Sequence, residues 1–116
     1  MMNKMMTSLA ALGLAGCATV QLPPERLQGS EASIRSAEEG GALGVPAAKL
    51  RLQVARDETD TAKKMAASGD PRAVLVLARA ESDAELALGM AREVAVHADA
   101  MQATEDLKAV RARGTP

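Results

Sequence analysis

The sequence predicts an all-α fold: an alanine-seamed antiparallel helical hairpin with a shorter first helix, three helices in all, after a cleaved signal peptide. Alanine and aliphatic residues recur at alternating spacings of three and four, which is a helical period. The prolines lie at 23, 24, 46, 71 and 116, near the expected ends of helices. The 116 residues include no Phe, Tyr or Trp, so close-packed helices are expected rather than a thick core.

The first 16 residues have the three zones of a secretory signal peptide. Lys4 supplies the charge, residues 5–15 are apolar or small apart from Thr7 and Ser8, and Gly16 precedes the single cysteine, Cys17. A membrane-spanning helix needs about 20 apolar residues, and this run is too short. Cleavage between Gly16 and Cys17 is therefore predicted.

The end of the signal resembles the lipobox of bacterial lipoproteins, with Leu14, Ala15, Gly16 and Cys17 matching its four positions. The resemblance implies that Cys17 is the lipidation site, carrying diacylglycerol on its sulfur. Two or three acyl chains anchor a protein far more firmly than one. A disulfide within the chain is excluded, because there is no second cysteine.

Four segments follow from this reading. Residues 1–16 are the signal, 17–23 a lipidated tether, 24–111 the helical domain and 112–116 a disordered tail. Since 14 basic residues less Lys4 leave 13 against 15 acidic ones, the processed chain has a formal charge of −2. A nucleic-acid-binding protein would show a basic face, so that class is not expected.

The first helix is expected over 24–39, where Ile34 and Ala37 offer a thin apolar stripe and Glu31 is placed to pair with Arg35. Residues 40–46 end it. The second helix is expected over 46–68, with one continuous stripe of mostly small residues: Ala48, Leu52, Ala55, Thr59, Ala62 and Ala66.

The turn after the second helix is marked by three residues. Gly69 suits a left-handed helix end, Asp70 is a strong N-cap and Pro71 is a favourable first-turn residue. The third helix is expected over 71–111. Its stripe alternates by four and three as in a coiled coil: Ala73, Leu77, Ala80, Ala84, Ala87, Ala91, Val94, Ala98 and Met101.

The two long helices differ in length, so the second covers the third only to about Arg92. Val94, Ala98 and Met101 then form a candidate interaction stripe. Helix one could extend to cover them, another protein or a second copy could bind them, or the segment could fray. A compact three-helix arrangement with a projecting C-terminal end is expected.

Most of the processed chain resembles an uncharacterised alanine-rich helical domain of bacterial envelope lipoproteins. The segments "VPAAKLRLQVA" and "KKMAASGDPRAVLVLARAESDAELALGMAR" carry the likeness, which covers residues 32–92. In relatives the domain often precedes an OmpA-like peptidoglycan-binding domain. Since this chain stops at Pro116, that second domain and its binding activity are not expected here.

Catalytic chemistry finds no support in the sequence. His97 shares a helix face with Glu93, but a zinc site wants three or four ligands, so no metal and no other cofactor is expected. Successive members of the set Glu81, Asp83 and Glu85 are two residues apart, and residues at that spacing do not face one another on a helix, so the set is expected to form a solvated face. No enzyme activity and no small-molecule substrate are therefore expected.

The sequence thus predicts a membrane-anchored, periplasm-facing lipoprotein of the bacterial cell envelope, acting as a non-enzymatic structural or protein-interaction module. Ala18 follows Cys17 where aspartate would resemble an inner-membrane retention signal, so the outer membrane is favoured. The expected partners are the membrane, through the lipid, and either an envelope protein or a second copy. The alternative is an accessory or inhibitor subunit of an envelope enzyme or transporter.

Overall fold

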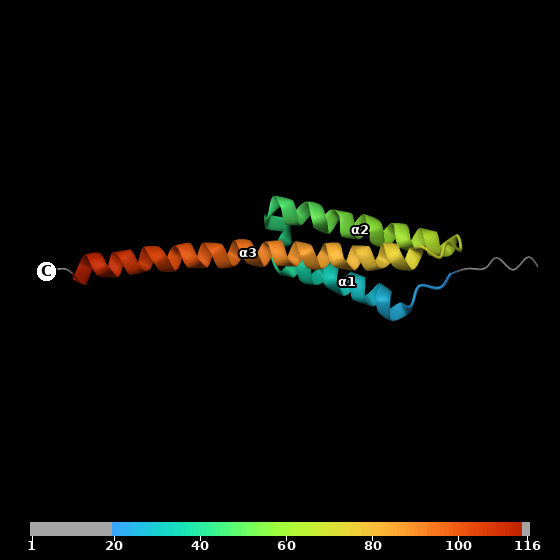
Figure 1. Cartoon of the computed structure of the whole chain (residues 1–116), viewed down its shortest axis with the longest axis horizontal. Helices are drawn as coiled ribbons and strands as arrows, with labels where there is room; N and C mark the ends of the chain where they lie inside the picture. Colours follow the sequence, from blue (N-terminus) through green and yellow to red (C-terminus); the bar gives the residue numbers. More distant parts are fainter. Residues whose placement is uncertain (1–19, 115–116) are drawn as a thin grey trace, which may run out of the picture.

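The computed structural model describes residues 20–114, which form three α-helices and one short 3₁₀ turn (Figure 1). The order is α1 (Pro24–Glu39), η1 (Ala42–Gly44), α2 (Pro46–Ala67) and α3 (Ala73–Gly114). No strand occurs within these residues. The expected all-α class and the count of three helices are confirmed.

Helix α2 lies beside the first part of α3 and runs in the opposite direction (Figure 1). Arg51 pairs with Asp83 at 3.4 Å, while Glu58, further along α2, pairs with Arg79, further back along α3, at 2.9 Å. Between the helices, every position of the expected α2 stripe is buried: Ala48, Leu52, Ala55, Thr59, Ala62 and Ala66. Alanine at four of these six positions lets the two backbones approach closely.

The turn between α2 and α3 forms as the sequence predicts. Gly69 has φ +78°, its N–H donates to the Ala66 carbonyl, and the Asp70 N–H donates to the Met65 carbonyl at 2.9 Å. These two bonds define a Schellman ending. The Asp70 carboxylate accepts the Arg72 N–H at 2.9 Å and so caps the entrance to α3.

Helix α1 packs back against the other two helices rather than extending α2. Arg26 lies 3.8 Å from Glu81 of α3, and Lys63 of α2 donates to Glu31 at 3.0 Å. Glu31 therefore pairs across helices instead of with Arg35 on its own helix, because the α2 lysine is brought within reach. Ile34 and Ala37 are buried as expected.

A buried hydroxyl pair, Ser30 and Thr59, joins α1 to α2, with 2.9 Å between the two oxygens. Thr59 also donates to the Ala55 carbonyl at 2.8 Å. A hydroxyl has a single proton, so Ser30 is the donor to Thr59. At Gly40, which follows α1, an added Cβ would lie against the end of the Leu88 side chain of α3, and that side chain would have to shift.

Helix α3 ends at Gly114, beyond the expected end at 111. Residues 112–114 are therefore helical, and the expectation of a disordered tail from 112 is wrong for these three. No proline precedes Pro116 in this stretch, and Arg111 and Arg113 lie in the last turn, where basic side chains favour the helix dipole. Arg113 Nε also donates to the Ala109 carbonyl at 3.2 Å.

Candidate interaction surface

The C-terminal part of α3 projects beyond α1 and α2 (Figure 1). Ala91 is the last buried residue, and every residue from 92 to 114 is exposed. At 1.5 Å per residue, the 22 residues of α2 span about 33 Å and the 42 residues of α3 about 63 Å. The bundle therefore covers little more than the first half of α3, as the difference in length predicts.

The expected interaction stripe lies on this projecting part. The exposed fraction is 50% for Val94 and 60% for Met101, and Ala98 is exposed too. The stripe continues the line of α3 residues that is buried as far as Ala91. The same line is thus a packed core beside α2 and an open surface beyond it.

A groove lies where this stripe begins, between the start of α2 and α3. Apolar side chains supply most of its lining and two polar ones complete it: Val45, Ala47, Met90, Val94, Glu93 and His97. Within the bundle, the first residues of α2 thus leave an apolar recess next to Val94. A partner that binds the stripe can reach the bundle through this recess.

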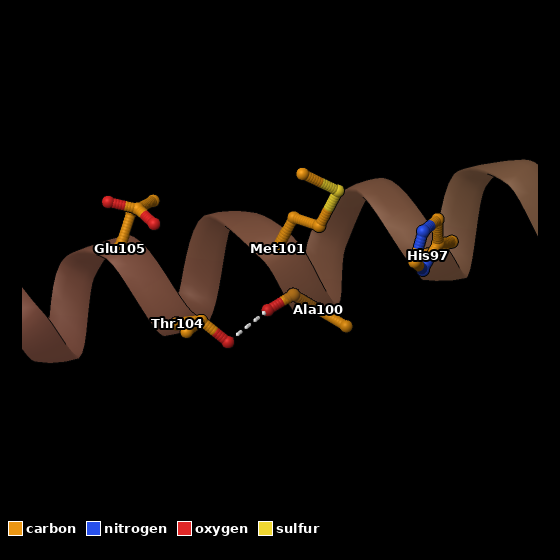
Figure 2. Close-up of a pocket in the computed structure, with 5 residues that line it drawn as sticks. All are labelled: His97, Ala100, Met101, Thr104 and Glu105. Atoms are coloured by element: carbon orange, nitrogen blue, oxygen red, sulfur yellow. Dashed lines mark hydrogen bonds between the residues drawn. The ribbon is translucent and has the colours of Figure 1, made fainter.

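A second hollow lies entirely on the projecting helix. Figure 2 shows its lining, with Met101 and Glu105 drawn above the helix axis and Ala100 and Thr104 below it in this view. Thr104 donates to the Ala100 carbonyl at 2.9 Å, so its hydroxyl is engaged by its own helix. Because one helix supplies every wall, the hollow is an open part of the surface rather than an enclosed site.

A second apolar line on the projecting part was missed by the sequence reasoning. Val96 is 66% exposed, Leu107 59% and Val110 61%, and Ala100 and Ala103 lie between them. Their spacing of four, three, four and three was available in the sequence. The line faces away from the α2 seam, so extending that seam does not reach it.

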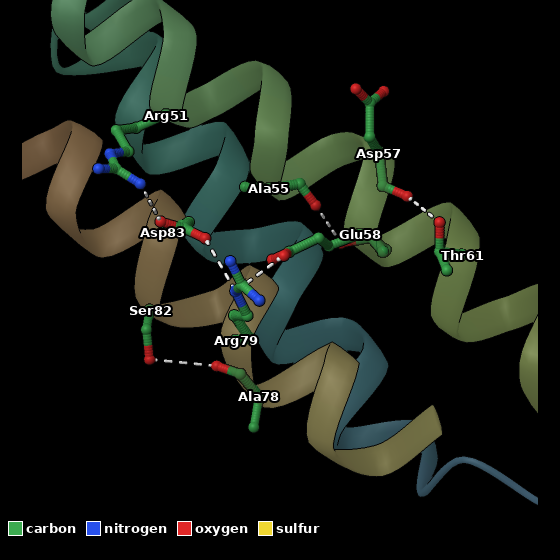
Figure 3. Close-up of polar contacts among 10 residues, drawn as sticks. Arg51, Ala55, Asp57, Glu58, Thr61, Ala78, Arg79, Ser82 and Asp83 are labelled. Carbon is green, nitrogen blue, oxygen red and sulfur yellow. Dashed lines mark hydrogen bonds and ion pairs between the residues drawn. The ribbon is translucent and has the colours of Figure 1, made fainter. Parts of the chain in front are cut away.

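Charged side chains form a network between α2 and the covered part of α3 (Figure 3). Arg79 lies 2.9 Å from Glu58 and 4.0 Å from Asp83, and Arg51 lies 3.4 Å from Asp83. Burial raises the pKa of Glu58, Arg79 opposes that rise and Asp83 adds to it. Glu58 Oε2 is buried without a hydrogen-bond partner, which adds to the cost of its charge.

This network fits a structural role in joining α2 to α3. Glu81 pairs with α1, Asp83 with α2 and α3, and Glu85 is exposed, so the three acidic residues do not converge. Within residues 20–114, no group of three or more His, Cys, Asp or Glu side chains could hold a metal ion.

The predicted cleavage and lipidation residues, Gly16 and Cys17, lie outside the described residues. Within residues 20–114, none of the helices is both long and apolar enough to cross a membrane. Comparisons with protein-family models, with curated proteins and with solved structures found no match.

Proposed function

We propose that this chain is a lipid-anchored, periplasm-facing lipoprotein of a bacterial envelope that acts as a non-enzymatic protein-interaction module. The observation that carries the proposal is the projecting part of α3, residues 92–114, which exposes apolar side chains beyond the reach of α1 and α2. Exposed apolar patches of this kind mark interaction sites. In this proposal, partners bind the stripe of Val94, Ala98 and Met101.

The proposed architecture is an alanine-seamed antiparallel hairpin of α2 and α3, braced by α1 and preceded by a cleaved signal peptide. Ion pairs from α1 to both other helices support this bracing. Arg26 pairs with Glu81 of α3, and Glu31 and Glu38 pair with Lys63 and Arg56 of α2. The acylated Cys17 would be joined to α1 by the tether 17–23. Seven extended residues reach at most about 25 Å, so the bundle would stay close to the lipid surface.

The direction of the helices supports a role at a distance from the membrane. Helices α1 and α3 run in the same direction, since Arg26 meets Glu81 and Gly40 meets Leu88. The start of α1 and the end of α3 therefore lie at opposite ends of the molecule (Figure 1). From the level of Glu81, α3 continues for about 50 Å, so a chain anchored at Cys17 would present its projecting part away from the lipid.

Palmitate labelling combined with membrane fractionation tests the anchor. The intact chain and Cys17→Ala are compared, with Thr19→Ala as a control that leaves the four lipobox positions unchanged. We expect lipid label and membrane retention in the intact chain and in Thr19→Ala, and loss of both in Cys17→Ala. An intact chain that is unlabelled and soluble would overturn the proposed anchor and location.

The groove beside Val94 favours a second candidate function, an accessory or inhibitor subunit of an envelope enzyme or transporter. Its mostly apolar lining with two polar side chains resembles the surroundings of a protein-binding hot spot. A photo-crosslinking residue at position 94 distinguishes the two functions. One dominant partner of fixed stoichiometry would support the subunit, and several partners, or the chain itself, would support the interaction module.

A further inference from the structure

The projecting part of α3 carries two apolar lines on nearly opposite sides of the helix. The first is the stripe of Val94, Ala98 and Met101. The second consists of Val96, Ala100, Ala103, Leu107 and Val110, which we call the outer line. At about 100° per residue, the outer line lies roughly 180° from the first. The two lines can therefore bind different partners.

The outer line is the longer uninterrupted one. Beyond Met101, the first line meets Glu105 and Lys108, which form an ion pair at 2.8 Å. From Val96 to Val110, by contrast, every position of the outer line is apolar. Val96, Leu107 and Val110 are each exposed by more than half, so water covers an apolar strip about 21 Å long.

The approach to the outer line is open beside the bundle as well. Gly89 lies on the same face, one heptad before Val96, and a Cβ built on it would meet no atom within 4 Å. Helices α1 and α2 contact α3 on other faces, through Glu81 and Asp83. A second helix can therefore lie along the outer line without displacing either of them.

We propose that a second copy of this chain covers the outer line, in a parallel and in-register coiled coil. The spacing sets the heptad: Val96, Ala103 and Val110 occupy d positions, and Ala100 and Leu107 occupy a positions. The alanines allow close approach of the two helices, and the larger side chains supply the apolar area. The dimer is the smallest assembly that satisfies this arrangement.

Flanking charges favour the parallel orientation. In a parallel pair, a g position faces the next e position of the other helix, so Asp106 meets Arg111 of the second copy, twice by symmetry. Arg111 also has an interaction within its own chain, and the five donors of a guanidinium can serve both. In the two antiparallel registers that keep the lines in contact, carboxylates meet instead: Asp99 faces Asp106 in one, and Asp106 faces its own counterpart in the other.

Sedimentation of the purified full chain carrying Cys17→Ala tests the association without any lipid. We expect a concentration-dependent dimer or larger oligomer at up to about 0.1 mM. Leu107→Glu should weaken association at least about tenfold, a change of about 1.4 kcal/mol. Ala109→Glu, the matched control at an exposed position outside both lines, should leave it unchanged. A monomer at every concentration, or dissociation by Ala109→Glu as strong as that by Leu107→Glu, would overturn the proposal.

Disulfide trapping tests the orientation. Val110→Cys on the Cys17→Ala background provides one thiol at a d position, which meets its counterpart only when the copies are parallel and in register. We expect mild oxidation to link two chains through Val110→Cys but not through Ala109→Cys, which points away from the outer line. An oligomer that Val110→Cys fails to link would overturn the parallel arrangement.

Discussion

The covered and projecting parts of α3 belong to one continuous helix and share the same apolar period, yet they have opposite surroundings. In residues 73–91 the stripe is buried against α2, and ion pairs to neighbouring helices flank it. In residues 92–114 every side chain is exposed. The ion pair Glu105–Lys108 joins residues of the same turn there, not two helices. Periodicity therefore identifies an apolar face, while the lengths of neighbouring helices decide whether the chain itself covers that face.

The largest expected difference comes from removing a leucine from each part. Leu77 is 1% exposed and Leu107 is 59% exposed. We expect Leu77→Ala to lower the free energy of unfolding by about 2–5 kcal/mol, because it leaves a cavity in the core. Leu107→Ala should change it by less than about 0.5 kcal/mol. Urea unfolding followed by circular dichroism, at low chain concentration, measures both.

Equal losses of unfolding free energy in Leu77→Ala and Leu107→Ala would contradict the contrast between the covered and projecting parts. Such a result would mean that residues 92–114 are covered in solution and unfold with the bundle. An effect of Leu107→Ala that grows with chain concentration would instead link its stability to association.

The next effect concerns the hydroxyl pair that joins α1 to α2. Thr59→Val keeps the shape of the side chain but leaves the buried Ser30 hydroxyl without its acceptor. We expect a loss of about 1–3 kcal/mol in unfolding free energy. Adding Ser30→Ala should recover part of this loss, because the orphaned donor is then removed. Additive losses of unfolding free energy in the double variant would show that Ser30 and Thr59 are not coupled through this hydrogen bond.

The sequence predicts the covered part well because its signals are local. Gly69, Asp70 and Pro71 mark a turn through their own backbone preferences, and the buried stripe of α2 follows from spacing alone. Helix α1 was harder to place, since Ile34 and Ala37 form too thin a stripe to indicate a neighbour. Its position depends on contacts such as Ser30 with Thr59, 29 residues apart, which no local pattern reveals.

The projecting part was predicted incompletely for a different reason. Extending the α2 seam places Val94 in an interaction stripe; the side chain is half exposed, and its role in binding stays a prediction. Val96 and Leu107 follow an equally regular spacing, but they face away from the seam. No other segment of the chain supplies a matching stripe for this face, so the regular spacing reveals the face without indicating what covers it.

A smaller effect is expected at Gly89, two residues before the boundary between the two parts. Its backbone is helical, and an added Cβ would meet open space. Gly89→Ala should therefore raise the unfolding free energy by up to about 1 kcal/mol, because alanine is the better helix former. Amide hydrogen exchange would show slower opening around the boundary. A loss of stability would indicate that another chain packs against this glycine.

The smallest effect is the pH dependence of the charge network, which concerns only the covered part. Burial raises the pKa of Glu58 above its usual 4.5, so the folded chain holds this proton more tightly than the unfolded chain does. The resulting stability is fully present below pH 4.5 and is lost as the pH rises through the folded value. Asp70 has the opposite pH dependence. Its hydrogen bond with Arg72 lowers its pKa to about 2, so the stability it contributes is lost as the pH falls toward that value.

Urea midpoints between pH 4.5 and about 7 isolate the contribution of Glu58, because Asp70 is largely ionised there in both states. Glu58→Gln should flatten the decline of stability with pH, since glutamine stays neutral throughout this range. The amides of residues 92–114 should exchange at the same rate in both variants, because Glu58 contacts only the covered part of α3. If Glu58→Gln changed their exchange as strongly as that of residues 73–91, the two parts would open together. Ala91 would then not mark a boundary between two segments of different stability.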